Sequence, residues 1–202
     1  MLITALHPVP LAPEISLHLA DAEVGLFDAG GGEFRSDEPP PFWAFVWAGG
    51  QALARWVLDH PEAVRGRSVL DLAAGSGVVA IAAARAGAAR VVAADVDPAA
   101  EAAALRNAAA NHVPITTGDE PAERFDVVLA GDAFYAPSVA GRMTQVLRQH
   151  ARRGARVLVG DPGRGYFPAA SFDLIATYAV PVPAALEDAE ALTTGVYEMR
   201  PR

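Results

Sequence analysis

Short apolar runs alternate with longer stretches of helical spacing between residues 68 and 160. The runs are rich in valine and leucine, as expected of strands that are buried on both faces. We predict strands at 69–72, 91–95, 115–117, 125–131 and 156–160, and helices at 77–86, 98–111 and 137–149. This alternation is typical of α/β proteins, in which a parallel sheet carries helices on both faces.

The pattern differs on either side of this region. Residues 14–20 alternate between apolar and polar and predict a strand, with 24–27 as its candidate partner. Residues 51–59 have the spacing of an amphipathic helix. Residues 172–180 and 194–199 predict two final strands with no long helix between them. The parallel sheet is therefore expected to close with a hairpin-like pair of strands.

One stretch, Ser-Val-Leu-Asp-Leu-Ala-Ala-Gly-Ser-Gly at residues 68–77, predicts a strand, a glycine turn and the start of a helix. Asp95 follows Gly75 by twenty residues, which is the usual spacing of a ribose-binding acid in a nucleotide-type site. Asp71 ends the first strand, where its carboxylate can accept hydrogen bonds from a cationic amino-acid tail but would repel a pyrophosphate. The pattern therefore favours S-adenosylmethionine as the ligand.

Two other interpretations of this turn stay open. Residues 75–80 also fit the dinucleotide fingerprint G-x-G-x-x-G/A, and a glycine turn can serve only to pack a helix tightly on a strand. Asp97 precedes Pro98 and is expected to cap a helix rather than bind a ligand. The residues that we expect at the cofactor are Trp47, Asp71, Gly75, Ser76, Gly77, Asp95, Val96, Asp119, Ala130 and Gly131.

The chemistry of the acceptor is expected just after the strand at 125–131, where the sequence continues Asp132-Ala-Phe-Tyr135. A carboxylate there can accept from an amine N–H, and Tyr135 can supply a hydroxyl and an aromatic wall for a methylated ammonium. The alternative is that Asp132 caps the helix that begins near Pro137. Phe134 is expected mainly to anchor this loop, and we include it among the substrate-binding candidates.

These motifs together resemble the seven-strand protein lysine methyltransferases, in particular the electron-transfer flavoprotein beta-subunit lysine methyltransferases and their bacterial homologues. The segments that carry the resemblance are 41–55, 64–72, 131–135, 160–164 and 192–194. The resemblance implies a Rossmann-like class I S-adenosylmethionine-dependent methyltransferase fold and a bacterial enzyme that methylates lysine in the flavoprotein subunit or a ribosomal stalk protein. It places Asp132 and Tyr135 at the acceptor lysine, with Asp161 and Arg164 shaping the acceptor side. Ala73 departs from the family pattern, which more often has glycine there.

Composition narrows the class of protein. A length of 202 residues suits one domain with a small extension, and we divide the chain into an N-terminal extension, 1–40, and a methyltransferase domain, 41–202. A net charge of −8 gives no reason to expect a nucleic-acid partner. No apolar run reaches the roughly 20 residues of a membrane span, and no targeting pattern is present, so we expect a cytoplasmic protein. Cysteine is absent, and we predict no metal site.

Three other functions compete with lysine methylation. A small-molecule N-methyltransferase of the nicotinamide type would share the same cofactor motif. A non-catalytic cofactor-binding domain would not need the pair Asp132 and Tyr135, and both residues are present. A dehydrogenase is disfavoured by Asp71. The sequence leaves the oligomeric state open.

Overall fold

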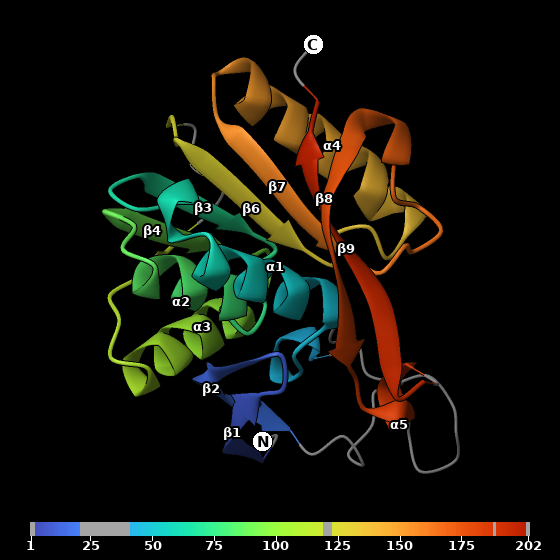
Figure 1. Cartoon of the computed structure of the whole chain (residues 1–202). Coiled ribbons are helices and arrows are strands. Elements are labelled where there is room, and N and C mark those ends of the chain that lie inside the picture. The colour runs from blue at the N-terminus through green and yellow to red at the C-terminus, as the bar shows by residue number, and fades with distance from the viewer. Residues whose placement is uncertain (1–2, 21–40, 119–122, 188, 201–202) are drawn as a thin grey trace.

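Seven strands form one sheet in the order β5-β4-β3-β6-β7-β9-β8 (Figure 1). The computed structural model describes residues 3–20, 41–118, 123–187 and 189–200. The strands of the sheet are β3 (Ser68–Leu72), β4 (Arg90–Ala94), β5 (Thr116–Thr117), β6 (Val127–Gly131), β7 (Arg156–Asp161), β8 (Phe172–Pro181) and β9 (Ala191–Met199). Every strand that we predict in this region is confirmed, with small differences at the ends.

The order of the strands reverses between β3 and β6. From β3 the chain runs outward through β4 to β5, and then returns to the other side of β3 to form β6 and β7, with all five strands parallel. β9 then pairs antiparallel with both β7 and β8. In open sheets of this kind, ligands bind outside the carboxyl ends of the strands at the point of reversal. The ends of β3 and β6 therefore mark the expected site.

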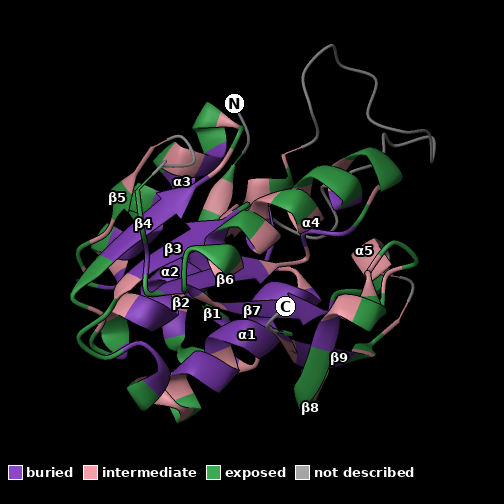
Figure 2. Ribbon diagram, turned by 90° about the horizontal axis from the view of Figure 1, so that it is seen from above, coloured by how far each residue is buried: buried purple, intermediate pink, exposed green. Residues whose placement is uncertain are grey.

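Helices cover the two faces of the sheet unequally. α1 (Ala48–Asp59), α2 (Val78–Arg85) and α3 (Pro98–Ala110) lie on one face, and α4 (Pro137–Arg152) lies on the other (Figure 1). Side chains alternate along each strand: Val127 and Leu129 of β6 join the core under α1 and α2, whereas Val128 joins the core under α4. Figure 2 shows the central strands as buried, which explains their nearly continuous apolar sequence.

A separate two-stranded sheet precedes the main one. β1 (Thr4–Val9) pairs antiparallel with β2 (Ala12–Ala20), so the predicted strand at 14–20 is confirmed, but its partner lies before it in the chain. The candidate partner at 24–27 lies outside the described residues. Pro8 within β1 weakens its strand signal, because proline cannot donate to a ladder and is confined to edge strands. Ile15 and Leu17 point into the core that α1 and α2 share.

Asn107 of α3 and Asn111, the residue directly after this helix, attach the hairpin to the main domain. Asn107 Oδ1 accepts from the backbone N–H of His18 at 2.8 Å, and Asn111 Oδ1 accepts from that of Ser16 at 3.0 Å. Asn111 Nδ2 also donates to the Ser16 carbonyl at 2.6 Å. Asn107 Nδ2 reaches the other way and donates to the carbonyl of Ser76 in the glycine turn at 2.9 Å. The hairpin and the glycine turn therefore share one buried side chain.

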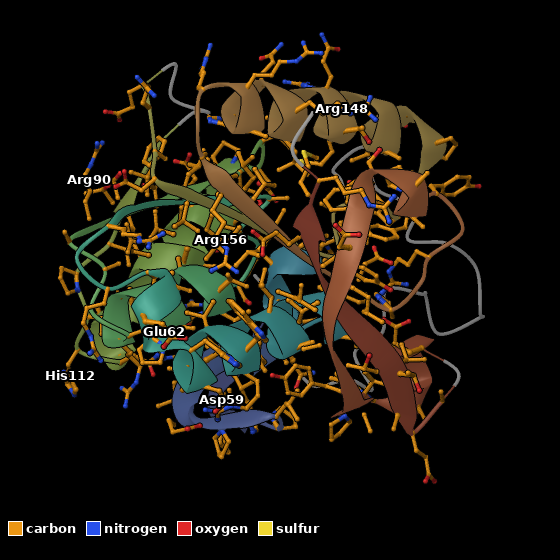
Figure 3. The ribbon with its side chains drawn as sticks, turned by 45° about the horizontal axis from the view of Figure 1, so that its top comes forward. Asp59, Glu62, Arg90, His112, Arg148 and Arg156 are labelled. Carbon is orange, nitrogen blue, oxygen red and sulfur yellow. The ribbon has the colours of Figure 1, made fainter. Side chains whose placement is uncertain are left out.

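Several arginines at the surface have local partners (Figure 3). Arg156 contacts the Glu198 carboxylate at 2.7 Å, Arg148 donates to the Ser171 hydroxyl at 2.7 Å, and Arg90 pairs with Glu123 at 2.6 Å. The longest helix in the described ranges has 16 residues, and none of those helices has the length and apolar character needed to cross a membrane.

Candidate active site

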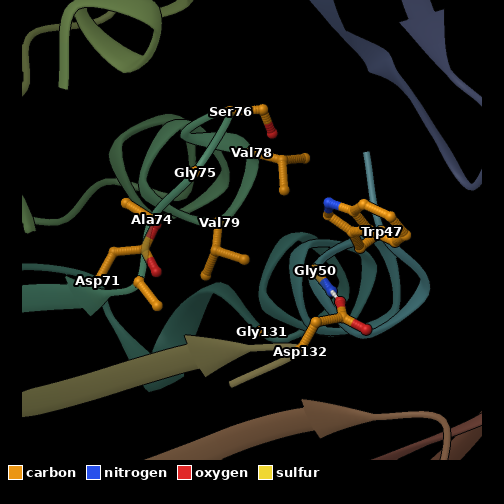
Figure 4. A pocket seen from close by; sticks show the side chains of 11 residues that line it. Trp47, Gly50, Asp71, Ala74, Gly75, Ser76, Val78, Val79, Gly131 and Asp132 are labelled. Atoms are coloured by element: carbon orange, nitrogen blue, oxygen red, sulfur yellow. Dashed lines mark hydrogen bonds between the residues drawn. The ribbon is translucent and has the colours of Figure 1, made fainter. Parts of the chain in front are cut away.

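A cleft of about 950 Å³ opens at the carboxyl ends of β3, β4 and β6. A smaller cavity of about 40 Å³ adjoins it beside Asp71 and Ser76 (Figure 4). Both are lined by Trp47, Ala73, Gly75, Gly131 and Asp132. The rest of the large cleft is lined by Phe42, Trp43, Leu72, Ala94, Asp95, Val96, Asp97, Pro98, Ala100, Tyr135, Val139, Arg142, Met143, Val146 and Arg164. Several of the residues predicted at the site therefore lie together around one cleft.

Asp71 supplies a buried carboxylate to the small cavity. Only 1% of the residue is exposed, and its Oδ2 accepts from the backbone N–H of Ala80 in the first turn of α2 at 2.9 Å. Burial raises the pKa of Asp71 to about 8, and the nearby charge of Asp95 adds to this effect. A cationic group in the adjoining cavity would favour the charged form, so the position suits the ammonium group of an amino-acid tail.

Asp95 follows β4 and shapes two turns at once. Its Oδ2 accepts from the Gly75 N–H at 2.9 Å, and its Oδ1 accepts from the Asp97 N–H at 3.0 Å. Each carboxylate oxygen has a second lone pair, so the group can still accept from two hydroxyls of a ligand. Asp97 caps α3, as predicted, because its side chain accepts from the Ala99 N–H at 2.8 Å. Val96 stands on the rim of the cleft and is 88% exposed.

The two glycines of the turn have different roles. Gly75 (φ +50°) lines the cleft, and a Cβ there would lie 3.9 Å from the Cα of Trp43, which is an ordinary van der Waals contact. Gly77 (φ +80°) lines neither cavity, and a Cβ on it would lie 2.9 Å from the Cβ of Ala104 in α3. The structure therefore gives Gly77 a packing role, because its missing side chain makes room for α3. Ala73 also has a positive φ, +56°, where the resembling family more often has glycine.

Of the other expected cofactor residues, Trp47 and Gly131 line both cavities and Ser76 lines the small one. Trp47 is fixed by its indole Nε1–H, which donates to the carbonyl of Phe42 at 2.9 Å. Ala130 is fully buried in the core under α4, so the expectation that it lines the site is wrong. Asp119 lies outside the described residues.

Asp132 lies where β6, α1 and the loop after β7 meet. Its Oδ2 accepts from the backbone N–H of Gly50 in the first turn of α1 at 2.8 Å (Figure 4), and its Oδ1 lies 3.3 Å from Arg164 Nη2. Burial raises the pKa of Asp132 to about 7, although Arg164 and the Gly50 N–H act in the opposite direction. α4 is preceded by Ala136 with no side-chain cap, so the alternative that Asp132 caps that helix is wrong.

Arg164 is held between two carboxylates. Its Nη2 lies 2.7 Å from Glu187 Oε1 and 3.3 Å from Asp132 Oδ1, and its guanidinium lies 5.9 Å from the centre of the Trp47 ring. Glu187 ends the short helix α5 (Ala184–Glu187). Asp161 does not line the cleft. It is fully buried, and its Oδ1 accepts from the Gly163 and Arg164 N–H groups at 2.7 and 2.9 Å, so it shapes the turn that presents Arg164.

The two aromatic residues after Asp132 point in opposite directions. Tyr135 is 50% exposed, lines the cleft, and has its ring 5.6 Å from that of Phe42. Phe134 is fully buried and packs against Phe167 and Phe172 with ring centres 5.4 and 6.3 Å away. Phe134 therefore anchors the loop, and its inclusion among the substrate-binding candidates is wrong because no part of it reaches the cleft.

Sequence reasoning missed three contributors to the site. Gly50 supplies the N–H that holds Asp132, Glu187 holds Arg164, and Phe42 of the 3₁₀ turn η1 (Phe42–Ala44) lines the cleft beside Tyr135. The pair Gly49-Gly50 at the start of a predicted helix was a usable signal, because glycine there allows close backbone approach. Glu187 had no signal in the sequence, since only the folded chain brings it to Arg164.

The chain is similar in sequence to known methyltransferases. Residues 55–152, which include Asp71, Asp95 and Asp132, match the sequence profile of a family described as ribosomal protein L11 methyltransferase (PrmA). Over 173 residues the chain is 38% identical to the electron transfer flavoprotein beta subunit lysine methyltransferase of Mus musculus. That alignment covers 80% of this chain and 68% of the mouse protein.

Solved structures share the architecture. A putative RNA methyltransferase from Pyrococcus horikoshii matches with a TM-score of 0.59 and 17% identity, covering 82% of this chain and 90% of that one. Magnesium protoporphyrin IX methyltransferase from Synechocystis, with bound S-adenosylhomocysteine, matches with a TM-score of 0.53 and 15% identity, covering 75% and 81%. At these identities the likeness concerns the fold, and it confirms the Rossmann-like seven-strand prediction.

Proposed function

The chain belongs to the family of electron transfer flavoprotein beta subunit lysine methyltransferases, and from this premise we propose that it transfers methyl groups from S-adenosylmethionine to lysine side chains of a protein. The observation that carries the proposal is the position of Asp132, a nearly buried carboxylate at the junction of the cleft and the small cavity. The groups around the cleft fall into a donor side and an acceptor side.

The donor side fits S-adenosylmethionine in chemistry and in size. Asp71 would hold the ammonium group of the amino-acid tail, Asp95 would hold the ribose hydroxyls, and Gly75 leaves the backbone accessible. The cleft of about 950 Å³ falls within the upper range for small-molecule sites. When bound, S-adenosylmethionine supplies an electrophilic methyl group on a sulfonium centre. The residues of this chain would orient the donor and exclude water around it.

The acceptor side fits a long cationic side chain that enters from solvent. Asp132 would attract the lysine ammonium, which must release one proton to solvent before it can react. The carboxylate would then accept a hydrogen bond from the neutral amine, which keeps the nitrogen lone pair directed away from the carboxylate and toward the methyl group. Tyr135 and Phe42 stand at the rim, and their rings would line the path of the aliphatic stem. Because Tyr135 is half exposed, this path is accessible to a side chain on another protein.

The electron transfer flavoprotein beta subunit is the favoured substrate, because the relatives that bear its name match 80% of this chain. Ribosomal protein L11 is the second candidate, and it is favoured by the family profile that matches residues 55–152. A bacterial source and a cytoplasmic location stay predictions.

The test uses S-adenosylmethionine with a labelled methyl group and the purified chain. The flavoprotein beta subunit, ribosomal protein L11 and nicotinamide are supplied in separate reactions. We expect label in one protein, located by mass spectrometry as methyl-lysine in a single tryptic peptide and lost when that lysine is replaced by arginine. Label on nicotinamide alone would make the chain a small-molecule N-methyltransferase. Donor binding without any transfer would favour the non-catalytic domain.

A further inference from the structure

Asp132 is surrounded by groups that act on its charge in opposite directions. Among the described residues, Arg164 and the Gly50 N–H stabilise its ionised form, and Asp161 opposes it. Glu187 acts through Arg164, because the same guanidinium nitrogen lies 2.7 Å from Glu187 and 3.3 Å from Asp132. The arrangement therefore joins three ionisable groups from three parts of the chain.

The sharing of Arg164 between the two carboxylates is unequal. Glu187 receives both terminal nitrogens, at 2.7 Å to Oε1 and 3.4 Å to Oε2, whereas Asp132 has one contact at 3.3 Å. The side chains of Glu187 and Asp132 are only 10% and 11% exposed, so water screens this competition weakly. A guanidinium that paired fully with Asp132 would cancel the negative charge that an incoming lysine ammonium needs.

We propose that Glu187 is a positioning residue that draws the Arg164 guanidinium toward itself, so that Arg164 neutralises the Asp132 carboxylate only in part and Asp132 can receive the cationic acceptor. This inference rests on the proposed function for the identity of the acceptor, but the electrostatic coupling itself does not. Glu187 touches neither the cleft nor the expected position of the donor. Its effect on turnover should therefore be electrostatic and should pass through Arg164 and Asp132.

The variant Glu187→Gln keeps a hydrogen-bond acceptor for Arg164 and removes the charge. The carboxyl carbon of Asp132, assigned by comparison with Asp132→Asn, is titrated by ¹³C NMR in the full chain without substrate. We expect the Asp132 titration to move to lower pH by roughly one unit, because the positive charge of Arg164 is no longer shared. Glu187→Asp, which restores the charge, should move it back toward the wild-type position.

Kinetics provide the second readout. The substrate is the unmethylated form of the protein that the wild-type chain labels. With this substrate, Glu187→Gln should lower kcat/KM about tenfold at pH 8.5, since one pKa unit corresponds to a tenfold change in interaction. The affinity for S-adenosylmethionine should not change. Glu190→Gln is the matched control, because Glu190 is exposed on the same segment and should leave both the titration and kcat/KM unchanged.

The two proposals fail in different ways. An Asp132 titration that stays in place or moves to higher pH in Glu187→Gln would overturn the role of Glu187. A wild-type chain that methylates no protein would overturn the proposed function, while the titration would still report on the coupling. Loss of kcat/KM in Glu187→Gln with an unmoved titration would reduce Glu187 to a structural support of α5.

Discussion

Individual glycines set how closely the segments around the cleft approach one another. A Cβ on Gly131 would lie 2.7 Å from the Cα of Gly50, so these two positions bring the end of β6 against the start of α1. This contact places the Gly50 N–H within 2.8 Å of Asp132. Asp132 has φ +52°, a left-handed conformation that costs about 1 kcal/mol in residues other than glycine. Its position is therefore imposed by the packing around it.

The two turn glycines should respond differently to alanine. Gly77→Ala should lower the free energy of unfolding by about 3 kcal/mol, because it combines left-handed strain with a clash against Ala104. Gly75→Ala has similar backbone strain but no clash, because the new Cβ would lie 3.9 Å from the Trp43 Cα, so the loss should be about 1 kcal/mol. Urea unfolding of both variants measures the difference. Equal losses would show that α3 does not require Gly77.

A site residue could be predicted where a local sequence pattern marks it, and could not where its role depends on which segment packs opposite it. Asp71, Asp95 and Asp132 were predictable because each ends a buried strand, and the ends of parallel strands meet at one edge of the sheet. The role of Gly77 was not, since a left-handed glycine gives the same pattern whether a ligand or a helix stands opposite. The prediction that Ala130 lines the site was wrong because successive residues of a strand differ in their surroundings, and only the next residue, Gly131, reaches the cleft.

At the scale of elements, the N-terminal hairpin is joined to the cofactor turn through α3. Asn107 accepts from His18 in β2 and donates to the Ser76 carbonyl, and no part of the residue is exposed. Buried backbone groups that lose such a partner cannot turn to water. α3 thus acts as a bridge between a peripheral sheet and the turn that lines the small cavity.

Asn107→Ala should therefore lower the free energy of unfolding by about 2 kcal/mol, because two backbone groups lose their partner while the helix gains a better helix former. Gln145→Ala is the control, since Gln145 is exposed on α4 and its replacement should change stability by less than about 0.5 kcal/mol. The midpoints of urea unfolding give both values. If Asn107→Ala matched the control, the hairpin would not depend on this side chain.

Elements were predictable wherever an apolar pattern set them. The parallel strands and the three crossover helices follow from alternating apolar runs and helical spacing, and proline at the first turn marked the starts of α3 and α4. The pairing of β2 with β1 was hidden by Pro8, and the attachment of β2 to Asn107 depends on tertiary contacts that no local pattern encodes. At this scale the sequence therefore predicts which helices and strands form better than it predicts which elements pair or pack together.

At the scale of the whole molecule, buried carboxyl groups are concentrated at one end of the sheet. The pKa values of Asp71 and Asp132 are raised to about 8 and about 7, and burial also raises the pKa of Asp161. In the unfolded chain these carboxyls titrate near pH 4. Between about pH 4 and pH 8 the folded chain therefore binds more protons than the unfolded chain.

Stability without the donor should consequently fall as the pH rises from 5.5 to 8.5, because the slope of the unfolding free energy is negative wherever the folded state holds more protons. The carboxylates whose pKa is lowered, such as Glu14 and Asp126, act only below that range. Thermal midpoints at several pH values measure the effect. The double variant Asp71→Asn, Asp132→Asn should flatten the curve, and an unchanged slope would assign it to other groups.

The most direct test of the account separates donor binding from methyl transfer in two isosteric variants. S-adenosylmethionine binding is measured by calorimetry, and turnover is measured with the unmethylated form of the protein that the wild-type chain labels. Asp132→Asn should bind the donor as the wild type does and lose at least about 100-fold in turnover, whereas Asp95→Asn should weaken donor binding about tenfold. Normal turnover in Asp132→Asn would contradict the assignment of this carboxylate to the acceptor.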